Sequence, residues 1–137
     1  MLRRDYIQRM IEEYARVLAH VLGLSREGQH EEALNQLRTG TTTFFNIDPQ
    51  LIHVLLPSQL LKLLIQDKGL TSGQIEVFAE GLRVEADMLL NTKPGDAKDR
   101  YVKALALYEY VEHSDPTNFS IVRRNAIEEI MYSISAL

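Results

Sequence analysis

The chain has 137 residues, a formal net charge of −4 and no cysteine. A chain of this length can bury a core of its own, so we expect one domain over residues 1–137. The acidic balance argues against a nucleic-acid partner, and the lack of cysteine excludes disulfides and thiolate metal sites. With no apolar stretch that is long enough for a membrane span and no signal-like start, we expect a cytoplasmic protein with no membrane contact.

The first predicted helix runs from Asp5 to Leu22, because apolar residues recur there at nearly ideal helical spacing. Asp5 is placed to cap its start, and Gly23 is placed to end it in a left-handed conformation. Basic and aromatic residues alternate at its beginning, where we expect a contact with a protein partner. The candidate residues of this contact are Arg3, Arg4, Tyr6 and Arg9.

A second helix is expected from the turn at Gly28 to Phe45, because small and apolar residues continue one stripe along it. The stripe passes through Gly40, which costs a helix about 1 kcal/mol relative to alanine. A glycine at this position lets a neighbouring backbone approach closely.

The third region, residues 51–65, is apolar on nearly all sides, so we expect it to lie at the centre of the protein. Asp48 followed by Pro49 predicts its start. Pro57 predicts a kink or a division into two short helices, since proline cannot donate a hydrogen bond within a helix. Gly69 predicts its end.

A fourth helix is expected to begin at Thr71, which forms a capping-box pattern with Gln74, and to end near Leu90. Residues 91–95 read as a loop because they contain a Pro-Gly turn. The following Asp96 is placed to cap the next helix.

The next helix, within Lys98 to Asn118, has the best-defined apolar stripe and a sharp end. Asp115 and Pro116 end it, because a proline cannot continue a helix and restrains the residue before it. A final helix is expected from about residue 118 to 136, and its predicted buried face uses Ile121 or Val122, Ala126, Ile127, Ile130, Met131 and Ile134. The residues that share the buried face of the earlier helix are Tyr101, Ala104, Leu105, Tyr108 and Val111.

Leu107 and Tyr110 place further apolar surface on the far side of this helix. Either the final helix or a second copy of the chain is needed to cover it. We expect the final helix to cover Leu107 and Tyr110 to lie at the edge of a two-fold homodimer. Both residues are therefore candidate partner contacts.

Two segments resemble elements of a tetratricopeptide repeat. Tyr101, Ala104 and Tyr108, followed by Asp-Pro-x-Asn, are similar to the second helix of that repeat. Residues 28–34, Gly-Gln-His-Glu-Glu-Ala-Leu, resemble another element. Ala33 precedes Ala104 by 71 residues, close to two periods of about 34.

The opening segment, residues 4–12, resembles a small uncharacterised bacterial family with tetratricopeptide-like helices. The resemblance implies an all-α fold of about six helices, arranged as antiparallel hairpins in a right-handed array. It implies no activity.

No pattern in the sequence predicts a catalytic, cofactor or metal site. Glu27 and His30 form one Glu-x-x-His motif, whereas a di-iron bundle needs two such motifs and two further glutamates. The acidic group within residues 109–115 surrounds a single helix end, so we expect it to be solvated. We therefore expect no catalytic residue, no cofactor and no metal.

The sequence thus predicts a non-catalytic helical module for protein interaction or scaffolding. The alternative is a small-molecule-binding or regulatory domain with a cavity between helices near residues 51–65, and an enzyme ranks third. A closed apolar pocket with converging polar groups favours the ligand, and a broad exposed face favours the protein partner.

Overall fold

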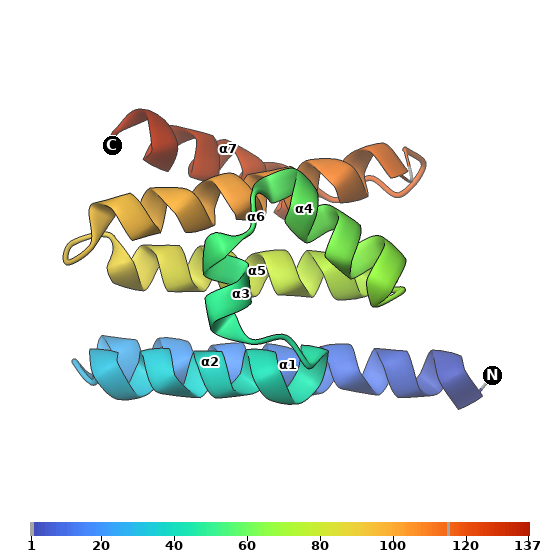
Figure 1. Cartoon of the computed structure of the whole chain (residues 1–137), viewed down its shortest axis with the longest axis horizontal. Helices are drawn as coiled ribbons and strands as arrows, with labels where there is room; N and C mark the ends of the chain where they lie inside the picture. Colours follow the sequence, from blue (N-terminus) through green and yellow to red (C-terminus); the bar gives the residue numbers. More distant parts are fainter. Residues whose placement is uncertain (1, 115) are drawn as a thin grey trace. The chain divides into compact units, whose positions relative to one another are not determined.

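The structure, a computed structural model, describes residues 2–114 and 116–137, together with their side chains except that of Leu2. These residues form seven α-helices and one π-helical turn, with no strand among them (Figure 1). The predicted all-α class is confirmed. The chain divides into two compact units, residues 1–54 and residues 55–137, and each is described by itself. The expectation of one domain stays a prediction.

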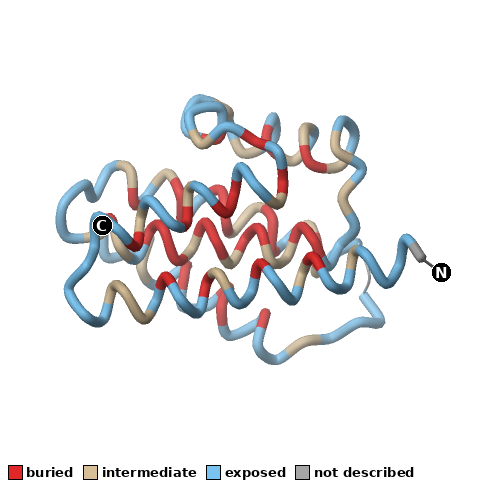
Figure 2. The backbone as a smooth tube through the Cα atoms, turned by 90° about the horizontal axis from the view of Figure 1, so that it is seen from below, coloured by how far each residue is buried: buried red, intermediate tan, exposed pale blue. Residues whose placement is uncertain are grey.

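The first unit consists of α1 (Leu2–Arg26), α2 (His30–Phe45) and α3 (Pro49–Val54). After a short turn, α2 packs along α1. Buried and exposed residues alternate along the helices, as expected where one face of each lies in a core (Figure 2). The core of the α1–α2 pair is made by Met10, Tyr14, Leu18, Val21, Ala33, Leu37 and Phe45.

The prediction that Gly23 ends the first helix is wrong. Helical hydrogen bonding continues past it, because the Glu27 N–H donates to the Gly23 carbonyl at 3.2 Å. The left-handed glycine after α1 is Gly28, with φ +82°. Asp5 is likewise not a cap, since it lies within the first turn of α1.

Gly40 lies inside α2, as predicted, and it is buried. A Cβ atom at this position would lie 3.1 Å from Cγ1 of Val17 and 3.6 Å from Cε1 of Tyr14. The close neighbours are therefore side chains of α1, whereas the sequence suggested a neighbouring backbone.

The apolar region after α2 divides at Pro57, as predicted, into α3, α4 (Pro57–Lys62) and a π-helical turn, η1 (Leu63–Asp67). The expectation that this region is central is wrong, because Val54 and Leu56 are 68% and 62% exposed. Short helices in this region bury few side chains each. The buried ones are Ile52, Leu60 and Leu64.

The second unit continues with α5 (Ser72–Leu89), α6 (Pro94–Ser114) and α7 (Ile121–Ser135). The predicted capping box is confirmed: the Gln74 N–H donates to Oγ1 of Thr71, and the Thr71 N–H donates to Oε1 of Gln74. Helix α6 packs against α4, α5 and α7. It is thus the central helix of this unit (Figure 1).

Helix α6 begins at Pro94, so the prediction that Asp96 caps it is wrong. Proline is well suited to a first helical position because its missing N–H has no partner there in any case. The predicted stop at Asp115 lies outside the described residues. Four of the five predicted face residues are buried: Tyr101, Ala104, Tyr108 and Val111.

Helix α7 starts after Ser120, whose Oγ accepts the Arg123 N–H at 3.1 Å. Its buried residues include Ala126, Ile127 and Ile130, as predicted. The prediction that Ile121 or Val122 and Met131 join them is wrong, since all three are exposed. The buried face is completed instead by Arg123.

Candidate functional site

A depression lies on the first unit, between the first half of α1 and the end of α2. Its volume is about 340 Å³. The lining side chains belong to Tyr6, Arg9, Met10, Glu13, Thr43 and Phe44. The four α1 residues follow one another at three, one and three positions, so they lie along one side of the helix.

The inner wall of the depression is held in place by aromatic packing. Phe44 meets Tyr14 edge to face, with ring centroids 5.8 Å apart, and Phe45 meets the same tyrosine at 4.9 Å. The Tyr14 hydroxyl lies 3.5 Å from Oγ1 of Thr41, which itself donates to the Leu37 carbonyl at 3.1 Å. Phe44 therefore projects from a rigid base.

The rim of the depression carries two charges of opposite sign. Arg9 and Glu13 are exposed, and neither side chain forms a hydrogen bond or ion pair with any described residue. Beside them, Met10 is buried and Phe44 is half-buried, which makes the floor apolar. An apolar floor with a few polar groups at its edge can hold an apolar side chain and orient the groups on either side of it.

The structure brings together two of the predicted partner-contact residues, Tyr6 and Arg9. Tyr6 is 68% exposed. Arg3 and Arg4 are exposed on the first turn of α1, but they are not among the lining residues.

The other two candidates lie on α6 in the second unit. Leu107 is fully buried, so it has no surface for a partner and is withdrawn as a contact. The packing of α7 on α6 accords with the expected cover. Tyr110 is half-buried, and its place at a dimer edge stays a prediction.

Sequence reasoning missed Met10, Glu13, Thr43 and Phe44. Met10 and Glu13 lie four residues after Tyr6 and Arg9, a spacing that places each pair on the same side of a helix, so this half of the lining was available from the sequence. Thr43 and Phe44 of α2 could not be predicted from the sequence, because they reach the site only through the packing of α2 on α1.

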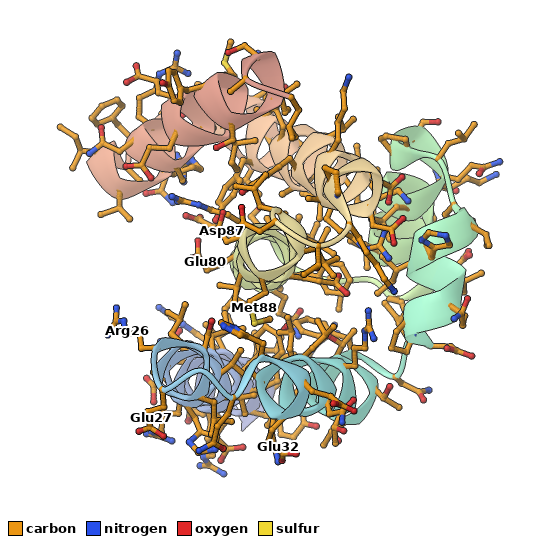
Figure 3. All side chains as sticks on the ribbon, turned by 90° about the vertical axis from the view of Figure 1, so that its left-hand side faces the viewer. Arg26, Glu27, Glu32, Glu80, Asp87 and Met88 are labelled. Carbon is orange, nitrogen blue, oxygen red and sulfur yellow. The ribbon has the colours of Figure 1, made fainter. Side chains whose placement is uncertain are left out.

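A polar network joins the three long helices of the second unit. The Tyr108 hydroxyl donates to Oε2 of Glu80 at 2.5 Å, and the Tyr101 hydroxyl donates to Oδ1 of Asp87. Both carboxylates leave the same side of α5, whereas Met88 leaves another (Figure 3). Between them in sequence, Arg83 pairs with Glu129 of α7.

The network changes the acidity of its members. Desolvation is the largest effect on Asp87 and raises the pKa of its carboxyl, although the Tyr101 hydrogen bond and the charge of Arg83 act in the opposite direction. Burial, reinforced by the neighbouring carboxylates, raises the pKa of the Tyr101 and Tyr108 hydroxyls. These tyrosines are therefore hydrogen-bond donors at neutral pH and not bases.

Arg123 fastens the start of α7 to the rest of the second unit. Its Nη1 lies 3.2 Å from Oε1 of Glu76, its Nε lies 3.4 Å from Oε1 of Glu112, and its Nη2 donates to the Asn118 carbonyl at 2.6 Å. On α6, Nζ of Lys103 lies 2.8 Å from Oδ2 of Asp99. Each buried cation is matched by carboxylates, which suits a structural role.

The histidines and acidic groups that were weighed as chemical motifs lie apart. Glu27 and His30 are exposed on either side of the α1–α2 turn. At the end of α6, Nδ1 of His113 lies 2.7 Å from the Glu109 carbonyl, and Glu112 pairs with arginines of α7. Within the described ranges, no three His, Asp or Glu side chains are grouped so that they could hold a metal ion.

The cavity that was expected near residues 51–65 for a small molecule stays a prediction. Nor does any helix in residues 2–114 or 116–137 have the length and apolar character needed to cross a membrane. Comparison of the chain with protein-family models, curated proteins and solved structures finds no match.

Proposed function

We propose that this chain is a non-catalytic helical module that binds a segment of another protein in the depression between α1 and α2. One observation carries the proposal: exposed Tyr6 and unpaired Arg9 and Glu13 stand over the apolar floor made by Met10 and Phe44. Aromatic and arginine side chains at the edge of a rigid, concave surface are the groups that protein interfaces favour. A bulky apolar residue of the partner fills the floor, with charged groups of both signs beside it.

We further propose that the helices form antiparallel hairpins in a tetratricopeptide-like, right-handed array. The support is the small residue at each helix pair, since Ala33 on α2 and Ala104 on α6 are both fully buried. An alanine between two packed helices allows them to approach closely. Stacked helix pairs then give a rigid scaffold. The lack of cysteine fits a role in the reducing cytoplasm. A crystal structure without this stacking would refute the array.

The binding function is tested with a peptide library displayed on phage and selected against the immobilised full chain. Selected peptides are then synthesised, and their affinities are measured by isothermal titration calorimetry. We expect peptides with one bulky apolar residue flanked by charges. Tyr6→Ser and Arg9→Glu should each weaken their binding about tenfold or more, because each removes a rim group.

Arg26→Glu is the matched control for Arg9→Glu. It makes the same charge change on an exposed arginine in the last turn of α1, at the end of the helix away from the depression. Peptides that bind all the variants equally well would show that the depression is not the binding site, and the proposal would be withdrawn.

A further inference from the structure

Ion pairs join helix α7 to both of the other long helices of the second unit. They involve charged side chains from the first turn of α7 to its middle. We call them the α7 ion pairs, and they are Arg83–Glu129, Arg123–Glu76, Arg123–Glu112 and Arg124–Glu112. Polar contacts therefore make up much of the attachment of this helix.

The apolar contribution of α7 to the core is small. Besides Arg123, its buried side chains are those of Ala126, Ile127 and Ile130. Large apolar side chains of the same helix are exposed instead: Ile121, Val122, Met131 and Tyr132. Helix α5 buries a larger apolar set: Ile75, Phe78, Leu82, Val84 and Leu89. Since apolar stabilisation follows the area removed from water, apolar packing holds α7 less strongly than α5.

The α7 ion pairs do not make up for this small apolar contact. Their charged groups lose water when α7 packs, and this desolvation offsets much of the attraction. The carboxylates remain in contact with solvent, since the side chains of Glu76, Glu112 and Glu129 are 34%, 24% and 62% exposed. Salt can therefore screen the attraction, while the desolvation cost remains.

Helices α5 and α6 hold each other without α7. The Tyr108 hydroxyl donates to Glu80, and the Tyr101 hydroxyl donates to Asp87, in both cases from α6 to α5. These two helices also pack against each other more extensively than α6 packs against α7, and α6 has a further contact with α4. The α5–α6 pair can therefore stay folded when α7 leaves it.

We propose that α7 is a releasable cover, which opens as one piece from α5 and α6 while those helices stay folded, and which the α7 ion pairs hold closed. Local opening of this kind is expected of an element with few buried apolar contacts. Release returns Arg123 to water and exposes Glu76 and Glu112, so no charge is left buried without a partner. The ionic strength around the protein thus sets how often this side of α5 and α6 is exposed.

Amide hydrogen exchange of the full chain tests the proposal, measured at pH 7 by mass spectrometry of peptic fragments and corrected for intrinsic rates. We expect the α7 amides to be protected at least tenfold less than those of α5 and α6. Raising sodium chloride from about 20 mM to about 1 M should lower the protection of α7 about threefold further, because the Debye length falls to about 3 Å. Fragments of α5 and α6 from the same samples are the internal reference.

A variant tests the part played by the ion pairs. Glu112→Gln keeps the size of the side chain but removes the charge that Arg123 and Arg124 share. It should lower the protection of α7 about tenfold and leave that of α5 unchanged. Glu109→Gln is the matched control, since it makes the same change at an exposed glutamate of α6 outside the α7 ion pairs.

The remaining outcomes contradict the proposal. Protection of α7 equal to that of α5 and α6 at both salt concentrations would show that α7 opens only when the whole unit unfolds. A less protected α7 that responds neither to salt nor to Glu112→Gln would show that the α7 ion pairs do not hold it closed. Equal losses of protection in α5 and α7 upon Glu112→Gln would show that the two helices open together.

Discussion

The surroundings of the Asp87 carboxylate oppose its charge, although the residue as a whole is exposed. It accepts a hydrogen bond from Tyr101 and lies near Arg83, but desolvation, together with the charges of Glu80 and Glu129, outweighs both and raises its pKa above the ordinary 3.8. The folded chain therefore holds this proton to a higher pH than the unfolded chain does. Between the unfolded and the folded pKa, the free energy of unfolding falls as the pH rises, and the loss persists at neutral pH.

We accordingly expect Asp87→Asn to be more stable than the parent at pH 7. Asparagine keeps an oxygen to accept the Tyr101 hydroxyl but has no charge to desolvate. The difference in melting temperature should shrink as the pH falls towards about 3, where the parent's carboxyl is protonated in both states. Thermal melts at several pH values check this, with Asp67→Asn as a control for the loss of one exposed carboxylate. A variant that is less stable than the parent at pH 7 would contradict the account.

At the scale of the helix, two glycines inside α1 and α2 look alike in sequence but differ in surroundings. A Cβ at Gly23 would have no atom within 4 Å, whereas a Cβ at Gly40 would press on Val17 at 3.1 Å. Val17 cannot easily turn away, because a β-branched side chain in a helix has one strongly preferred rotamer.

Gly23→Ala is expected to raise the free energy of unfolding by about 0.5–1 kcal/mol, the gain in helix propensity. Gly40→Ala has the same gain in helix propensity, but overpacking typically costs about 1–3 kcal/mol, which is more than that gain. This variant should therefore be less stable than the parent. Urea denaturation followed by circular dichroism compares the two variants. Equal stabilisation by both would show that the α1–α2 seam is looser than described.

Substitution of Ala104 tests how tightly α6 packs against its neighbouring helices in the second unit. It is fully buried on α6, so Ala104→Arg places a charge with no carboxylate reserved for it among packed helices. We expect a loss of several kcal/mol, on the order of 3–5, in the free energy of unfolding. A melting temperature within about 2 °C of the parent would show that the side chain at position 104 reaches solvent.

Local sequence rules predicted which helices form, but they misplaced the helix ends at Asp5, Gly23 and Asp96. The Thr71–Gln74 capping box and the division at Pro57 depend on neighbours within a few residues, and both are confirmed. Arg123 was missed as a buried residue because the carboxylates that neutralise it come from distant helices, including Glu76, 47 positions away. The candidate site divides in the same way: its α1 residues follow from helical spacing, and Phe44 follows only from packing.

At the scale of the whole chain, the passage from one compact unit to the next is an exposed apolar stretch outside the long helices. It carries exposed Val54 and Leu56 and lies between two short helices. Brief digestion with thermolysin, which cleaves before large apolar residues, should therefore cut early between positions 54 and 56. The expected fragments match residues 1–54 and 55–137, identified by mass spectrometry. First cuts within α5 or α6 would contradict the division into units.

The contact between Gly40 and Val17 also constrains how related sequences can diverge. A methyl group added at position 40 needs space that a smaller residue at position 17 would release, and Tyr14, one turn away on α1, lies in ordinary contact with the same point at 3.6 Å. Substitution at one position should thus be accompanied by substitution at the other. Homologous chains with alanine at 40 are expected to carry alanine, serine or glycine at 17, so these two positions, 23 apart in sequence, should change together through evolution.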